Sequence, residues 1–314
     1  MSPAAPLVFD ETAAHPDVRA VGTALAAKDW PAVTATVARH HGGARTRLIR
    51  WTGVKADRAF LESVRDADPA DGVAAAMLGT RMTHDAWEIR TGKLARDVSA
   101  AQFERFHAML RETEEMLVDA VAHKATDPAV WCVRLTTALG LRVGQAEARR
   151  RYTAVAALDP HHLPAQVQLQ QQLCPKWGGS WAEMDAFAQD ATHAAPEGAH
   201  NGVLVADAIY EHLLLDRDNR DKFLRNKANR QSLAEAADRS VLHPAFERTL
   251  GWVAVANSFA LMLSLVEDRG RAKRVFEVAG PWVTEHPWLI VGDPVEKFAR
   301  YRTRAAGSRW WLPW

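Results

Sequence analysis

The sequence has few cysteines and no long apolar run. Its 314 residues include two cysteines, Cys132 and Cys174, which are too few for a zinc site with four cysteine ligands. No other feature indicates an oxidising compartment, so we expect two buried thiols. No run of about 18 apolar residues is present, and residues 1–10 lack the charged and apolar pattern of a secretory signal. We therefore expect a cytoplasmic protein without a membrane-spanning helix.

The sequence also lacks an excess of charge of either sign. Lysine and arginine total 39, aspartate and glutamate total 38, and the formal net charge is +1. Proteins that bind nucleic acid or anionic membranes through their overall charge carry a clear positive excess. Two local stretches, 216–230 and 300–314, are rich in arginine. They leave nucleic-acid binding open as a third hypothesis, but we do not expect nucleic acid as a partner.

Tryptophan and helical periodicity are what the sequence has in abundance. It contains 12 tryptophans, and helical arrays need large side chains between their layers. Every strong hydrophobic period is helical, and no alternating strand pattern is bounded by hairpin turns. We expect an all-α fold, an irregular α-solenoid built as a tetratricopeptide-like helical-repeat array. Its expected parts are a flexible N-terminal arm (1–15), a single helical-repeat domain (16–305) and a tryptophan-rich C-terminal tail (306–314).

Two stretches match part of the 34-residue tetratricopeptide pattern. In the first, a turn near residue 144 separates two expected helices, and the pattern's positions for Leu, Ala, an aromatic residue and Pro are taken by Leu135, Ala148, Tyr152 and Pro160. The second match spans residues 259–279 around a turn at 268–270. Each match predicts two antiparallel helices joined by a short turn.

Other helices follow from periodicity and capping residues. We expect residues 216–230, which mix charges of both signs, to form an exposed connector. Gly42 and Gly43 should end the first helix pair, and His161 and His162 should lie exposed in a turn between helices. The remaining helices are expected at 17–27, 31–40, 55–65, 70–90, 100–125, 180–193 and 201–215.

The stretch 174–188 predicts a rigid elbow between two helices. Pro175 ends the first helix, and Gly178 and Gly179 permit a turn. Ser180 and Glu183 form a capping box for the next helix. Trp177 and Trp181 bracket the turn, so their rings can hold its angle by packing against neighbouring helices.

Part of this elbow also carries a family resemblance. The segments are Ala86–Gly92 (A-W-E-I-R-T-G), Phe106, and Lys176–Ser180 (K-W-G-G-S) followed by Met184, Phe187 and Ala188. Together they resemble the signatures of an uncharacterised bacterial family, a tetratricopeptide-like domain of unknown function. The resemblance covers about residues 70–200, and Thr91 is inserted where the family has adjacent Arg and Gly. It implies a tetratricopeptide-like fold and no particular activity.

Polar side chains share one face of the expected helix 70–90. At 100° per residue, one wedge holds Arg81, His84, Asp85 and Glu88, and the opposite side is apolar. One interpretation is a surface helix with ion pairs between residues four apart. The other is that the wedge lines a groove, where these groups bind a polar ligand or move a proton.

Two polar residues lie on the apolar side of the expected helix 100–125. His107 and Glu114 are seven residues apart and face the same way as the apolar stripe. Burying them is costly without partners, so each should contact another helix or a ligand, with Arg81 or Arg90 as the candidate cation. Glu104 and His107 have the Glu-x-x-His spacing of di-iron bundles, but no second helix repeats it. We therefore expect no metal and no cofactor.

The sequence contains no serine nucleophile elbow and no phosphate-binding glycine loop. The leading hypothesis is a helical-repeat protein that recognises a peptide or protein segment in a concave groove. The alternative is an enzyme or small-molecule binder with a pocket in the irregular middle region, residues 74–123. No catalytic residue can be assigned. The candidates for a groove that binds a ligand or partner are Arg81, His84, Trp87, Glu88, His107, Glu114 and Trp177.

Overall fold

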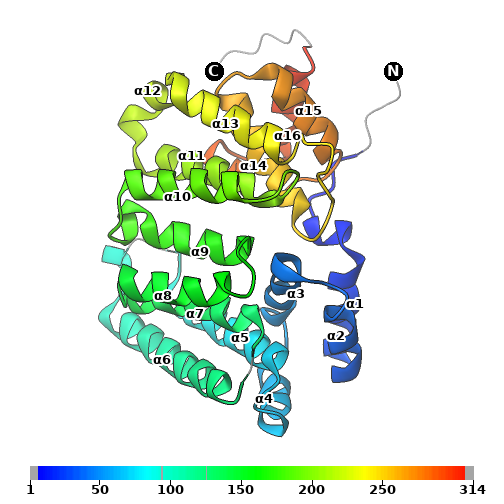
Figure 1. Cartoon of the computed structure of the whole chain (residues 1–314), viewed down its shortest axis with the longest axis vertical. Coiled ribbons are helices and arrows are strands. Elements are labelled where there is room, and N and C mark those ends of the chain that lie inside the picture. Colours follow the sequence, from blue (N-terminus) through cyan, green and yellow to red (C-terminus); the bar gives the residue numbers. More distant parts are fainter. Residues whose placement is uncertain (1–5, 93–94, 125, 308–314) are drawn as a thin grey trace. The chain divides into compact units, whose positions relative to one another are not determined.

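The computed structural model describes residues 6–92, 95–124 and 126–307, and the regular secondary structure of these residues is helical (Figure 1). They contain no β-strand and one isolated bridge, between Val8 and Trp282. The all-α prediction is confirmed. Within the same ranges, no helix combines the length and the apolar character needed to cross a bilayer.

The helices of residues 16–179 are Pro16–Ala26 (α1), Trp30–Val37 (α2), Gly42–Gly53 (α3), Arg58–Ala67 (α4), Gly72–Arg90 (α5), Ala100–Ala122 (α6), Pro128–Leu141 (α7), Gln145–Ala156 (α8) and Leu163–Leu173 (α9). Those that follow are Trp181–Ala194 (α10), Val203–Leu215 (α11), Arg220–Arg225 (α12), Lys227–Arg239 (α13), Trp252–Leu265 (α14), Arg269–Ala279 (α15) and Pro294–Ala305 (α16).

The chain divides into two compact units. Of the described residues, 16–179 form one, the α1–α9 unit, and 6–15 together with 180–307 form the other, the α10–α16 unit. The expected single domain over residues 16–305 is therefore shared between two units. Within the expected arm, residues 11–14 form a 3-10 helix. In the expected tail, residues 308–314 lie outside the described part of the chain.

Short polar side chains start most helices of the α1–α9 unit. Side chains at four N-caps accept hydrogen bonds from backbone N–H groups of the first turn, which otherwise have no partner; these caps are Asp29, Asp57, Asp71 and Asp127. At the start of α6, Ser99 and Gln102 form a complete capping box. The sequence therefore sets these helix boundaries locally.

The helices α5 to α9 pack against their neighbours along the chain. α5 contacts α6 and α7, and α7 contacts α8 and α9; Figure 1 shows α6 to α9 in succession. The predicted turn between α7 and α8 is present, with Gly144 at a φ of 91°. The helix pair expected at 259–279 is also present, as α14 and α15. This arrangement is compatible with an α-solenoid.

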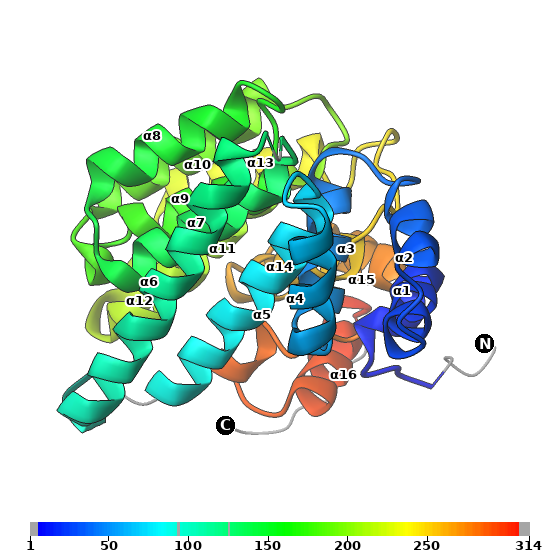
Figure 2. The ribbon, with the colours of Figure 1, turned by 90° about the horizontal axis from the view of Figure 1, so that it is seen from below.

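The prediction did not include α3. Gly42 and Gly43 were expected only to end the first helix pair, whereas α3 begins at Gly42. Two aliphatic side chains of α3, Leu48 and Ile49, are fully buried, and α3 contacts α5, α7 and α9 (Figure 2). At Gly53 an added Cβ would lie 3.0 Å from the carbonyl oxygen of Met77. The absence of a side chain at Gly53 thus allows α3 to approach α5 closely.

The α10–α16 unit has its own aromatic core. Trp288 is fully buried, and its indole nitrogen donates a hydrogen bond of 2.7 Å to Asn257 Oδ1. Phe298 of α16 packs edge-on against Trp288. The charged stretch 216–230 is mostly exposed, as expected, but it forms α12 and the start of α13 rather than a connector.

The elbow lies where the two units meet along the chain. Pro175 begins a 3-10 helix after α9, and Gly178 has a φ of 91°. A Cβ at Gly179 would lie 1.9 Å from the carbonyl oxygen of Leu173, so only glycine fits. Ser180 Oγ caps α10 by accepting from the N–H of Glu183 at 3.2 Å. The proline, glycine and N-cap assignments are confirmed.

Candidate functional site

The α1–α9 unit contains a groove between α3 and the helices α5, α7 and α9, which we call the α3 groove. Two hollows of about 260 and 280 Å³ form it. Both are bordered by Arg50, Val54 and Thr80, so they adjoin at these residues. The remaining lining residues are Arg47, Trp51, Thr83, His84, Trp87, Val133, Thr136, Pro164, Val167 and Gln168.

Arg50 is the cation at the centre of the α3 groove. Its Nη1 lies 3.6 Å from the thiol sulfur of Cys132, and its Nη2 lies 3.5 Å from Thr136 Oγ1. Both contacts are long and involve neutral groups. Among the described residues, no carboxylate lies within ion-pair distance of Arg50, whose side chain is half-buried. The guanidinium therefore keeps its capacity for a charged partner.

The environment of Arg50 also affects Cys132. The pKa of the Cys132 thiol is raised because the sulfur is completely buried, and the nearby positive charge of Arg50 opposes this shift. Cys132 and Cys174 are both buried free thiols, as predicted from the sequence.

A buried hydroxyl lines the same part of the α3 groove. Thr83 is 5% exposed, and its Oγ1 has no hydrogen-bond partner among the described residues. Thr80, one turn before it, donates instead to the carbonyl oxygen of Ala76 at 2.7 Å. An unpaired buried hydroxyl costs about 1–3 kcal/mol. Thr83 is therefore a residue of the groove wall whose hydroxyl is buried and unpaired among the described residues.

Aromatic rings extend the α3 groove along α5. The ring of Trp87 lies edge-on to those of Phe106 and Trp177, with distances between ring centres of 4.9 and 6.4 Å. The guanidinium of Arg90 lies 5.6 Å from the centre of the Trp87 ring. Trp177, the half-buried tryptophan of the elbow, thus packs against Trp87 but does not itself line the α3 groove.

The structure brings two of the predicted residues of α5 to the α3 groove. His84 and Trp87 line it. Arg81 pairs with Asp85 at 2.7 Å, which is the predicted pair four residues apart, and it also donates at 2.7 Å to the carbonyl oxygen of Val54. Arg81 therefore fixes the end of α3 to α5. Glu88 is exposed and does not line the groove.

Glu114 is a structural residue of a buried ion cluster, which we call the Glu114 cluster. Its carboxylate accepts hydrogen bonds from Arg134 at 2.7 and 2.9 Å, from Arg151 at 2.9 Å and from Thr137 at 2.6 Å. The two arginine side chains are 8% and 5% exposed. The expected partner from another helix is therefore present.

The identity of that partner was predicted wrongly. Arg134 belongs to α7 and Arg151 to α8, whereas we had named Arg81 and Arg90 of α5 as candidates. The reason is that α7 and α8 face this side of α6. His107 is half-buried beside Phe106, with ring centres 5.2 Å apart. Neither His107 nor Glu114 lines the α3 groove.

Sequence reasoning missed the residues that α3 contributes, because α3 itself was missed. In the segment Arg45–Trp51 (R-T-R-L-I-R-W), Arg50 and Trp51 follow Arg47 by three and four residues, which is helical spacing. Leu48 and Ile49 supply the apolar side of the same segment. This pattern is the signal that could have identified both the helix and its groove face.

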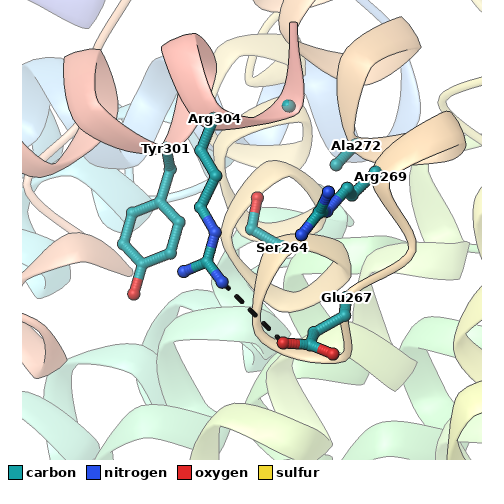
Figure 3. Close-up of a pocket in the computed structure, with 7 residues that line it drawn as sticks. Ser264, Glu267, Arg269, Ala272, Tyr301 and Arg304 are labelled. Carbon is teal, nitrogen blue, oxygen red and sulfur yellow. Dashed lines mark ion pairs between the residues drawn. The ribbon is translucent and has the colours of Figure 1, made fainter. Parts of the chain in front are cut away.

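Two hollows in the α10–α16 unit are weaker candidates. The first holds about 10 Å³, the space of one water molecule, beside the 3.8 Å ion pair between Arg304 and Glu267 (Figure 3). The second, about 440 Å³, is bordered by Arg248 and Arg274, which already donate to backbone carbonyl oxygens at 3.0 and 3.5 Å. Neither presents an unpartnered buried group.

Neither a metal site nor the comparisons with known proteins identify a function. Within residues 6–92, 95–124 and 126–307, no three His, Cys, Asp or Glu side chains are grouped so that they could hold a metal ion. The chain matches no protein-family model, no curated protein and no solved structure. The resemblance to a tetratricopeptide-like family therefore remains a hypothesis, and the function must be inferred from the α3 groove itself.

Proposed function

We propose that the α3 groove binds a peptide or protein segment. The observation that supports this most directly is the pair of hollows that adjoin at Arg50, Val54 and Thr80. Adjoining hollows offer an extended surface for an elongated ligand, whereas an enzyme site usually converges several polar groups on one pocket. The lining contains one imidazole, that of His84, and no carboxylate to act with it as an acid–base pair.

We further propose that α5 to α9 are tetratricopeptide-like repeats. In this proposal α5 with α6 and α7 with α8 are successive helix pairs, α9 begins the next pair, and α3 covers part of their inner side. The contacts of α5 with α7 and of α7 with α9 support it. Repeat arrays commonly bind extended partners on such inner surfaces.

A pair of tryptophan substitutions tests the binding proposal. Val54→Trp places a large ring where the two hollows adjoin, and Val118→Trp adds the same ring on α6, where Val118 is 47% exposed. Random peptides displayed on phage are selected on the full chain and then measured against both variants. We expect Val54→Trp to abolish binding and Val118→Trp to preserve it. Selected peptides that bind both variants equally would refute the proposal.

A further inference from the structure

The helices that form the α3 groove are almost free of acidic residues. α3, α7 and α9 contain no aspartate or glutamate, and α5 contains two, Asp85 and Glu88. Asp85 is paired with Arg81, and Glu88 is exposed outside the groove. Acidic residues are instead concentrated on α6, which carries five of them. A net charge of +1 therefore conceals a groove that is positive.

Arg50 supplies the specific group within this positive groove. It is half-buried, and its contacts among the described residues are to the neutral atoms Cys132 Sγ and Thr136 Oγ1. A guanidinium binds a carboxylate through two parallel hydrogen bonds, which is a geometry that neither a thiol nor a hydroxyl can replace. The unused capacity of Arg50 is explained if a carboxylate occupies the groove when the ligand is bound.

We infer that the segment bound in the α3 groove carries an aspartate or glutamate side chain that pairs with Arg50, next to apolar or aromatic residues. This inference rests on the proposed function. The apolar neighbours of the acidic residue pack on Trp51, Val54 and Trp87, which line the groove beside Arg50.

The lining favours an acidic peptide over a single-stranded nucleic acid. A groove for nucleic acid follows the phosphate backbone with a row of cations and stacks successive bases on aromatic rings. Here the lining holds two arginines, Arg47 and Arg50, rather than a row of cations, and its two tryptophans stand among three valines and a proline. One anchored carboxylate with apolar flanks matches this composition.

The experiment combines a peptide substitution with a protein substitution. Peptides selected on the full chain are sequenced, and one is labelled with fluorescein together with a copy in which Glu is replaced by Gln, or Asp by Asn. Their anisotropy is titrated with the unmodified protein, with Arg50→Met and with Arg105→Met. Arg105 is an exposed residue of α6, so this control matches the loss of charge.

We expect the selected peptides to be enriched in acidic residues and the amide copy to bind the unmodified protein about 10- to 100-fold more weakly. Arg50→Met should bind the acidic peptide more weakly by a similar factor, and it should bind the acidic and amide copies with equal affinity. Arg105→Met should behave as the unmodified protein.

The outcomes separate this inference from the proposed function. Peptides whose binding is lost in Val54→Trp but which lack acidic residues, or which Arg50→Met still distinguishes, would overturn the carboxylate inference and leave the peptide groove intact. If no selected peptide depends on Val54, the proposed function itself fails. Tight binding of an oligothymidylate that Val54→Trp abolishes would replace the acidic peptide with nucleic acid.

Discussion

The imidazole of His162 donates a hydrogen bond of 2.8 Å from Nε2 to Oγ1 of Thr46, which joins the start of α9 to α3. The ring's other nitrogen, Nδ1, accepts from the N–H of Ala165 and caps α9. Because Nδ1 is an acceptor, the proton of the neutral ring must be on Nε2. His162 is fully buried, and burial lowers its pKa from 6.5 to about 4.

This burial predicts a stability that falls in mild acid. Between the folded pKa of about 4 and the unfolded value of 6.5, the unfolded state binds more protons, so the free energy of unfolding falls as pH falls through this window. The effect of His162 should be about 2 kcal/mol between pH 7 and pH 5. Denaturant unfolding at the two pH values measures it. His162→Asn, which keeps a capping oxygen, should remove this part of the pH dependence, whereas the exposed His193→Asn should not.

The Glu114 cluster predicts a large effect for a nearly isosteric substitution. Glu114→Gln leaves the guanidinium groups of Arg134 and Arg151, both nearly buried, without their shared carboxylate. Removing one partner of a buried ion pair commonly costs about 3–5 kcal/mol. Because Glu114 keeps 15% exposure, we expect the lower end of this range in denaturant unfolding. Glu115→Gln, on the exposed side of α6, is the control, and equal midpoints for the two variants would contradict the assignment.

The two glycines of the elbow should respond differently to alanine. At Gly179 the new Cβ would overlap the carbonyl oxygen of Leu173 at 1.9 Å, so the backbone must move. At Gly178 the surroundings are open, and the cost is that of a left-handed φ of 91°. We expect Gly178→Ala to cost about 1 kcal/mol and Gly179→Ala about 3 kcal/mol or more. Thermal unfolding that ranks them in the opposite order would refute the steric explanation.

The tryptophan of the elbow should contribute more to stability than its N-cap. Trp177 is half-buried and supports Trp87, so Trp177→Ala should cost about 2 kcal/mol, less than the 3–5 kcal/mol of a fully buried ring. Ser180→Ala removes one capping hydrogen bond and should cost about 1 kcal/mol. Midpoints of denaturant unfolding compare the two. Removing Trp177 should also change the fluorescence of Trp87, which a loss of the cap alone would leave unchanged.

Local signals predicted most of the helices, but they did not predict α3, α12, α13 or α16. N-caps such as Ser99 and the glycines of the elbow act within a few residues of each boundary, so they can be identified from the sequence. α3 begins with two glycines, which usually interrupt a helix. Its stability comes from burial of Leu48 and Ile49 among other helices, and a pattern confined to one segment does not contain that information.

The candidate site was likewise predicted only in part from local sequence signals. Helical spacing correctly predicted the pair of Arg81 with Asp85 on α5, and it correctly indicated that Glu114 needs a partner. It could not identify that partner, because Arg134 and Arg151 lie 20 and 37 residues away and reach Glu114 only through the packing of α7 and α8. The expected exposure of His162 was wrong for a similar reason. His162 is buried because α3, which the sequence did not predict, packs over it.

The bridge between Val8 and Trp282 determines the order in which the chain can fold during synthesis. The N–H of Val8 donates to the carbonyl oxygen of Pro281, and the N–H of Val283 donates to that of Val8. Residues 16–179 form a continuous unit, so the ribosome can release everything that this unit needs while later residues are still being added. Residues 6–15 must wait for about 270 further residues, which takes tens of seconds at about 5–20 residues per second. Residues 6–15 thus leave the ribosome long before the residues with which they pair.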